Sequence, residues 1–384
     1  MSTRKTALIL GGGVGGLVTA NVLRREAPDS EIILIDREPE HLFAPSLLWL
    51  LIGERKASRI RRPLSRLERK GIRVVNGEIE HIDPQRRAVR AGGQEFTGDA
   101  LVIALGAELA QGKIPGLAQA GYNFYTLEGA EQARDALHRF RQGRLVVLTA
   151  TPAYKCPAAP YEAAMLAEYD CRRRGVRQQV EVAVYAAEPG PMGVAGQEVS
   201  GAVKAALAGK GIAYHPSHQV VRVEPESRTL HFDNGASAPF DLLLYVPPHQ
   251  APAVVRDSGL CGESGWMTTD RHTLRTAYPG VYAIGDVVSI PLQLGKPLPK
   301  AGVFAHHQAE VVARNIAATF AGREPTARFD GFGECFLEVG DGRAALGRGN
   351  FYGEPLPQIA LRKPSRMLHW GKVFFEKDWL RRWF

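Results

Sequence analysis

Three glycines near the start of the chain, Gly11, Gly13 and Gly16, follow an apolar segment and open a segment with helical spacing. Glycines let such a turn close tightly and let the backbone approach a pyrophosphate, which the first amides of the helix attract. Asp36 ends the next apolar segment, about 25 residues further on, where a carboxylate accepts hydrogen bonds from a ribose. The combination predicts a dinucleotide site, but the turn alone does not distinguish FAD from NAD.

Two later segments favour FAD. Residues 276–286 (TAYPGVYAIGD) place Asp286 after an apolar strand, as in the distal flavin motif of flavoproteins with two dinucleotide folds, where an aspartate binds the ribityl chain. Residues 99–106 (DALVIALG) are similar to the second motif of the same proteins and end in a turn at Gly106.

A third segment, residues 299–302 (PKAG), is expected to begin a helix whose first amides face the flavin. Lys300 and the helix dipole at Gly302 would then stabilise the anionic reduced flavin. The alternative for Lys300 is a solvated surface lysine.

A second glycine-rich turn is missing where a nicotinamide dinucleotide would need it. The apolar residues 144–150 (RLVVLTA) run into residues 151–162 (TPAYKCPAAPYE), which contain prolines and a lysine but no glycine. A pyrophosphate needs bare backbone at this place. We therefore expect no NAD(P)H site of the usual kind, and electrons must enter from another donor.

Cys156 lies in this glycine-free segment, just before a helix that begins with proline. The helix dipole and Lys155 are expected to lower the pKa of its thiol below the ordinary value of about 8.5. Glu162 follows one to two turns later and could accept a proton from sulfide or a thiol. Four cysteines in 384 residues are too few for a disulfide scaffold, so a redox role is favoured.

Nearly the whole chain resembles the sulfide:quinone oxidoreductases and the flavoprotein subunit of flavocytochrome c sulfide dehydrogenase. The segments that carry the resemblance are residues 43–46 (FAPS) with Trp49, 154–162 (YKCPAAPYE), 247–249 (PPH), 299–302, 335–338 (CFLE) and 369–380. The resemblance implies that Cys156 and Cys335 meet beside the flavin and carry sulfur. Attack of HS⁻ on a disulfide between them would give a persulfide and a thiolate. The alternative is two buried, inert cysteines.

The resemblance also concerns His249, whose loop approaches the active site in that family. His249 could relay protons, or it could be an ordinary loop histidine. The best-known members carry a third essential cysteine where this chain has residues 124–127 (FYTL), which favours a two-cysteine mechanism. We expect Cys171, on an exposed helix face, and Cys261, in a loop, to be bystanders.

The elements that must position these residues alternate between strands and helices, which favours an α/β fold with parallel sheets. We expect two tandem dinucleotide-binding (Rossmann-like) domains of the glutathione-reductase type. The FAD-binding domain would comprise residues 1–115 and 256–320, with a second domain that lacks a nicotinamide motif inserted at 116–255. Residues 321–384 would form a C-terminal α+β domain with an amphipathic tail near the membrane and the quinone.

The tail combines aromatic residues at helical spacing with basic residues. Phe375, Trp379 and Trp383 fall roughly on one stripe, and the basic residues around it are Arg362, Lys363, Arg366, Lys372, Lys377, Arg381 and Arg382. Such a face suits a lipid interface, where each basic residue near anionic lipid contributes about 1 kcal/mol. The basic residues 59–70 could face lipid too. The alternative is an amphipathic helix packed on the body or in a dimer.

Composition limits the remaining classes. A net charge of +8 favours an anionic partner, but no nucleic-acid module accompanies it. The first strand follows Met1 so closely that we expect no signal peptide. Adjacent His306 and His307 do not have metal-site spacing, and we expect no bound metal.

We therefore expect a peripheral cell-membrane enzyme that binds FAD, oxidises sulfide to zero-valent sulfur or polysulfide and reduces quinone. A homo-oligomer is compatible with this expectation. The alternatives are a type II NADH:quinone reductase-like flavoenzyme and a flavin-bearing cysteine redox sensor.

Overall fold

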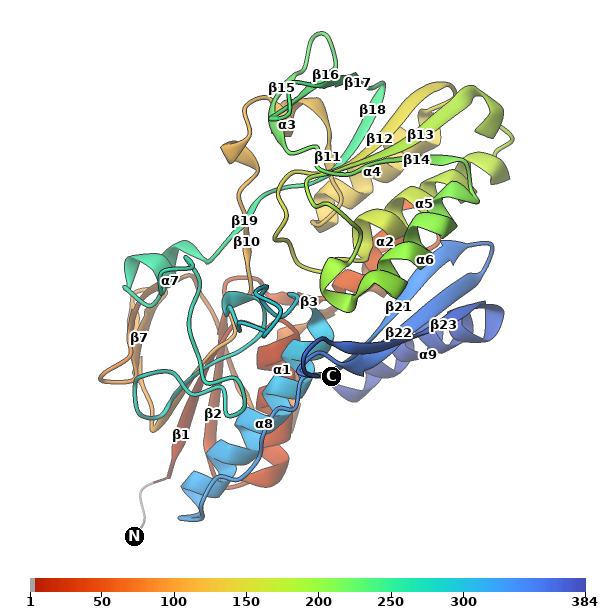
Figure 1. The fold of residues 1–384 in the computed structure, drawn as a ribbon. Helices are drawn as coiled ribbons and strands as arrows, with labels where there is room; N and C mark the ends of the chain where they lie inside the picture. The colour runs from red at the N-terminus through yellow and green to blue at the C-terminus, as the bar shows by residue number, and fades with distance from the viewer. Residues whose placement is uncertain (1–3) are drawn as a thin grey trace.

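The computed structural model describes residues 4–384 and contains two parallel sheets with helices around them (Figure 1). The first sheet has the strand order β20 (Val281–Ala283), β9 (Ala100–Ile103), β1 (Thr6–Leu10), β2 (Glu31–Asp36) and β5 (Arg73–Asn76). All its pairs are parallel. Its inner strands are runs of apolar residues, as expected where helices or loops cover both faces.

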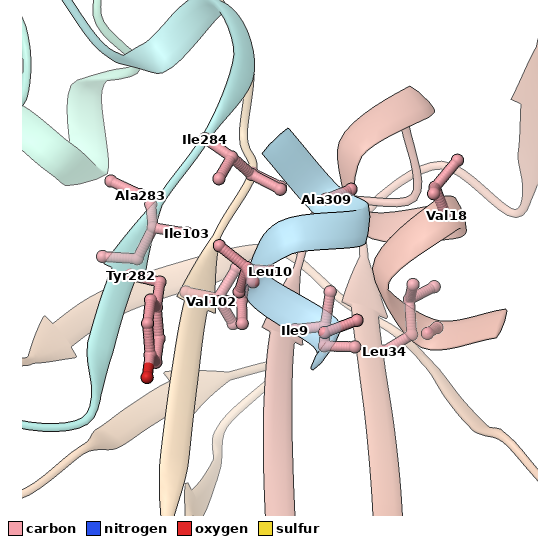
Figure 2. Packing of buried hydrophobic residues seen from close by; sticks show 14 of the residues in the cluster. Ile9, Leu10, Val18, Leu34, Val102, Ile103, Tyr282, Ala283, Ile284 and Ala309 are labelled. Atoms are coloured by element: carbon pink, nitrogen blue, oxygen red, sulfur yellow. The ribbon is translucent and has the colours of Figure 1, made fainter. Parts of the chain in front are cut away.

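Helices α1 (Val14–Glu26) and α8 (Gly302–Phe320) pack against each other beside this sheet. Figure 2 shows the core from close by, with Ile9 of β1, Leu34 of β2 and Val102 of β9 near Ala309 of α8. The helix that closes this core therefore comes from about 290 residues further along the chain than β1. Smaller elements around the sheet are β3 (Glu40–Leu42), β4 (Arg61–Pro63), α7 (Ala253–Asp257) and the antiparallel β6 (Ile79–Asp83), β7 (Ala88–Ala91) and β8 (Gln94–Thr97). The short helix α2 (Leu47–Leu51) packs instead on helices of the second parallel sheet.

The second parallel sheet has the strand order β11 (Tyr122–Asn123), β18 (Leu242–Val246), β12 (Gly143–Thr149), β13 (Val180–Ala186) and β14 (Ile212–His215). Helices α4 (Leu127–Arg139), α5 (Ala159–Arg173) and α6 (Gln197–Ala208) lie around it. Further elements of this part are α3 (Leu117–Ala120), the β10 (Glu108–Leu109) and β19 (His249–Gln250) pair, and the antiparallel β15 (Val220–Glu224), β16 (Thr229–Phe232) and β17 (Ser237–Pro239).

The C-terminal part consists of an antiparallel sheet of β21 (Phe332–Gly340), β22 (Arg343–Asn350) and β23 (Gln358–Ser365), followed by α9 (Arg366–Arg382). Ser365 caps α9 by accepting the amide of Leu368. β21 packs on α5 of the second sheet, so it connects the two halves of the molecule. The α/β class with two parallel sheets, typical of tandem Rossmann-like domains, is thus as expected. The domain boundaries stay a prediction, and residues 1–3 of the first domain lie outside the described part.

Candidate functional site

The glycine turn between β1 and α1 has the close contacts that only glycine allows. Gly11 has a φ of 101°, and a Cβ there would lie 2.5 Å from the carbonyl oxygen of Ala104. A Cβ on Gly16 would lie 1.8 Å from the carbonyl oxygen of Gly11. A Cβ on Gly13, in contrast, would meet no atom of residues 4–384 within 4 Å. The turn therefore leaves space above Gly13 for a pyrophosphate.

Asp36 lies at the end of β2, directly beside this turn. One carboxylate oxygen accepts the amide of Gly12 at 2.5 Å and the other accepts the amide of Glu38 at 2.7 Å. No side-chain donor of residues 4–384 binds Asp36, so each oxygen keeps a lone pair for a ribose hydroxyl.

Asp286 follows β20 and is partly buried, and its Oδ1 atom is shielded from solvent. Burial raises the pKa of its carboxyl group, while Lys155 and Lys300 oppose the rise. Its Oδ1 atom has no hydrogen-bond partner within residues 4–384. Buried polar atoms are nearly always partnered, so this oxygen points to a ligand hydroxyl. Together with the glycine turn, it fits FAD. Gly106, expected in the same site, has a φ of 67° after β9.

Lys300 is not a solvated surface lysine. Its ammonium group donates to the carbonyl oxygens of Asp286 and Val288, both at 2.8 Å, and lies 3.5 Å from the ring centroid of Trp266. Burial lowers its pKa to about 8. α8 begins at Gly302, as the sequence predicts. A cation and the start of a helix therefore lie beside Asp286.

The loop with Cys156 lies against the same segment. The amide of Cys156 donates to the carbonyl oxygen of Lys300 at 2.6 Å, and the hydroxyl of Tyr125 donates to the carbonyl oxygen of Cys156 at 3.1 Å. Cys156 has a φ of 52°, a left-handed conformation that costs a non-glycine residue about 1 kcal/mol or more. A strained cysteine is thus held beside the residues that fit a flavin.

Cys156 and Cys335 belong to one electrostatic cluster. Cys335 lies in β21, and both cysteines are free and partly exposed. Burial raises the pKa of the Cys156 thiol far above its ordinary value, and negative charge on Cys335 or Glu162 raises it further. Burial and Glu162 also raise the pKa of Cys335 to about 12. The expected lowering for Cys156 is therefore wrong, because desolvation outweighs the helix dipole.

Glu162 lies in the first turn of α5 and forms a buried ion pair. Its Oε1 atom accepts the ammonium group of Lys372 at 2.9 Å and the amide of Glu338 at 2.7 Å. Only 2% of Glu162 and 7% of Lys372 are exposed. The ammonium group lowers the pKa of both cysteine thiols, although burial outweighs it. The structure thus brings Cys156, Cys335 and Glu162 together, and a lysine joins them.

Lys372 was expected beside lipid and is instead part of the site. It lies 5.0 Å from the ring centroid of Trp49 in α2. Next to it, the buried carboxylate of Glu338 pairs with Nδ1 of His369 at 3.0 Å. The sequence contains one signal for this placement: Lys372 lies four residues after the apolar Leu368, on a helix face that faces inward.

His249 approaches the site from β19. Its Nδ1 atom lies 2.8 Å from the carbonyl oxygen of Pro247, and its ring packs edge-on against Tyr125 at 5.8 Å. Burial and Lys155 lower the pKa of His249 to about 3, so the ring is neutral at ordinary pH. With Nδ1 as the donor to Pro247, Nε2 is a bare acceptor. A proton relay through a charged His249 is not supported.

The aromatic residues of α9 divide between two faces. Trp379 and Trp383 are buried in the core around the first sheet, so the expected lipid-facing stripe is wrong for these two. The exposed apolar residues lie on another face, with exposed fractions of 73% for Met367, 67% for Trp370, 69% for Phe374 and 45% for Phe375. No helix within residues 4–384 is long and apolar enough to cross a membrane.

The other cysteines lie elsewhere. Cys171 is buried in the core around α5, contrary to the exposed position expected. Cys261 is partly exposed and forms a backbone bridge with Met267.

Comparisons with known proteins show the family of this chain. Residues 5–309 match the family model of the pyridine nucleotide-disulphide oxidoreductases. The chain is 28% identical to the sulfide-quinone reductase of Aquifex aeolicus (98% of this chain, 90% of that protein). It is 25% identical to the mitochondrial sulfide:quinone oxidoreductase of Mus musculus (91% of this chain, 79% of that protein).

The crystal structure of the sulfide:quinone oxidoreductase from Aquifex aeolicus superimposes with a TM-score of 0.90 and 27% identity, covering 99% of this chain and 91% of that one. Proteins of this kind typically bind FAD. The chain belongs to the pyridine nucleotide-disulphide oxidoreductase family and, within it, to the sulfide:quinone oxidoreductase family.

Proposed function

We propose that this protein binds FAD, oxidises sulfide to zero-valent sulfur or polysulfide through Cys156 and Cys335, and delivers the electrons to a quinone at a membrane surface. The observation that carries the proposal is the convergence of both cysteines on the Glu162–Lys372 ion pair. A reactive sulfur centre needs both a proton acceptor and a cation that stabilises thiolate.

The FAD would be held by the features described above. The turn at Gly11, Gly13 and Gly16 would take the pyrophosphate, Asp36 the ribose, and Asp286 the ribityl chain. Lys300 and the start of α8 at Gly302 would provide positive charge beside the flavin, and Gly106 would line the same site. FAD, when bound, would accept two electrons from the sulfur centre and pass them to the acceptor.

The chain's own residues account for the sulfur step. HS⁻ attacks a disulfide between Cys156 and Cys335, so that a new S–S bond forms as the old one breaks. One cysteine becomes a persulfide and the other leaves as a thiolate, which the ammonium group of Lys372 stabilises. Glu162 accepts the proton when H₂S rather than HS⁻ enters. His249, neutral and with a bare Nε2, can orient the incoming sulfide as a hydrogen-bond acceptor.

The C-terminal helix supports a quinone as acceptor. One face of α9 exposes Met367, Trp370 and Phe374, and the exposed basic residues nearby in sequence are Arg362, Lys363, Arg366 and Lys377. An apolar patch with basic neighbours suits the interface of anionic lipid. The opposite face carries Lys372 into the sulfur site. A single helix could therefore connect a lipid-soluble acceptor with the redox centre.

The test is anaerobic stopped-flow mixing of the purified flavoprotein with sulfide, NADH or a thiol, followed by flavin absorbance. We expect sulfide to bleach the flavin and NADH to leave it oxidised. Cys156→Ser and Cys335→Ser should abolish bleaching by sulfide, whereas Cys261→Ser, the matched control, should retain it. Full activity in both site variants, or rapid bleaching by NADH, would contradict the proposal.

A further inference from the structure

Glu188 lies two residues after β13, at the carboxyl edge of the second sheet, and only 9% of it is exposed. Its carboxylate accepts hydrogen bonds from three hydroxyl groups of the chain. Thr149, the last residue of β12, donates at 2.7 Å, and Tyr154 and Tyr161 donate to the other carboxylate oxygen. Thr149 in turn accepts the amide of Ala187 at 3.1 Å. Side chains of the protein thus take three of the roughly four acceptor positions of this carboxylate.

The first sheet offers an internal comparison. Asp36 ends β2, the strand next to the glycine turn, and is bound by backbone amides alone. Glu188 has the equivalent position after β13, the strand next to β12. In a dinucleotide fold, an acidic residue at this place binds the ribose. Here the hydroxyls of Tyr154 and Tyr161 bind the carboxylate.

Both tyrosines belong to the segment that contains Cys156. Tyr154 comes two residues before the cysteine, and Tyr161 comes five residues after it. Burial, aided by negative charge on Glu188, raises the pKa of both phenols, so both keep the protons that they donate. Between them the backbone passes through the left-handed conformation of Cys156, which persists only when its surroundings hold it.

We propose that Glu188 is a positioning residue, which ties both ends of the Cys156 loop to the edge of the second sheet and so holds the thiol beside Cys335 and the start of α8. The carboxylate that would bind a nucleotide ribose serves here as an anchor for the sulfur loop. The inference rests on the proposed function in one respect, that Cys156 is the thiol whose position matters.

The test measures thiol geometry without sulfide or quinone. The flavin-loaded protein is reduced with dithiothreitol, freed of reductant, and treated with a bifunctional bimane that bridges two neighbouring thiols. In a parallel sample, iodoacetamide labelling of Cys156 is compared by mass spectrometry with that of Cys261 in the same molecule. We expect Glu188→Leu to slow bridging of Cys156 to Cys335 about tenfold, because the loop loses its orientation. Labelling of Cys156 relative to Cys261 should rise.

Matched variants separate positioning from general destabilisation. Glu188→Gln keeps an acceptor oxygen for the tyrosines and should restore most of the bridging rate. Glu181→Gln on β13, in an exposed ion pair with Arg144, should behave like the wild type. If Glu188→Leu does not fold, Tyr154→Phe and Tyr161→Phe, each lacking one oxygen, replace it, with Tyr185→Phe on β13 as their control.

The outcomes are distinct from those for sulfide oxidation. Unchanged bridging and labelling in folded Glu188→Leu, or in both phenylalanine variants, would overturn the role of Glu188. Flavin that sulfide does not bleach, together with altered bridging in these variants, would overturn the proposed donor and leave the anchor intact.

Discussion

Replacing Lys372 with methionine removes the ammonium group that faces Glu162 and both thiols, while it keeps most of the side-chain volume. The ion pair is buried, with Lys372 Nζ 2.9 Å from Glu162 Oε1. Removing one partner of a buried pair costs about 3 to 5 kcal/mol, because the other charge stays desolvated. The amide of Glu338 still binds Glu162, so we expect the lower end, about 3 kcal/mol of unfolding free energy.

The same change acts on the thiols. The ammonium group of Lys372 lowers the pKa of Cys156 and of Cys335, so its loss raises both pKa values. One pKa unit corresponds to about 1.4 kcal/mol, and charges a few ångströms apart inside a protein interact at least this strongly. Only the thiolate is nucleophilic. At a fixed pH below the pKa, alkylation of reduced Cys335 by iodoacetamide should therefore slow about tenfold.

The assays are urea unfolding and alkylation rates between pH 7 and pH 10. The matched control is Lys377→Met, which removes an exposed lysine from the same helix. The double variant Lys372→Met/Glu162→Gln removes both charges and should recover most of the lost stability. If Lys372→Met equals Lys377→Met in stability and in the pH dependence of alkylation, the ion pair does not have the role argued above.

Three further predictions concern other parts of the molecule. Gly16→Ala should fail to yield folded flavoprotein, because its Cβ would lie 1.8 Å from a carbonyl oxygen. Gly13→Ala should fold but bind FAD more weakly. Circular dichroism measures folding of both variants, and flavin titration measures their affinity for FAD. Trp370→Ser with Phe374→Ser should lower flotation with anionic vesicles at least tenfold, while Val221→Ser, an exposed residue of β15, should not; equal flotation would contradict the lipid-facing patch. His249 has a folded-state pKa of about 3 against an ordinary 6.5, so the unfolded chain takes up its proton first, and stability is lost as the pH falls from 6.5 towards 3. His249→Gln should lose less stability over this range in urea unfolding, and an equal loss would disprove the shift.

The sequence predicted those parts of the fold that depend on residues close together in the chain. β1 and β12 are short runs of apolar residues, and α8 begins at Gly302, where the sequence predicts a helix start. Asp36 ends β2 and Asp286 follows β20, and both strands belong to one parallel sheet. The carboxyl ends of parallel strands share an edge, so strand order alone brings these two residues to the same edge.

The parts that the sequence did not predict depend on distant contacts. Lys372 meets Glu162 across 210 positions. Its place four residues after Leu368 indicates a helix face that turns inward, but it does not identify the partner. The sequence predicts a lowered pKa for Cys156 from two neighbouring features alone, the helix dipole and Lys155. Cys335 of β21 and Lys372 of α9 also act on this thiol, and burial raises its pKa instead of lowering it. The sequence neighbours of a thiol therefore do not predict the direction of its pKa shift when distant parts of the chain also surround it.

The C-terminal helix shows how two faces with similar composition can be told apart. Aromatic residues occur on both faces of α9, so hydrophobic periodicity alone does not decide which one packs on the protein. The charged residues of α9 show which face packs on the protein. Glu376 lies on the same face as Trp379, and its carboxylate accepts Ser46 at 2.6 Å and pairs with Arg55 at 2.8 Å. Lipid offers no such partners, so an aromatic stripe that also carries Lys372 and Glu376 must face the protein.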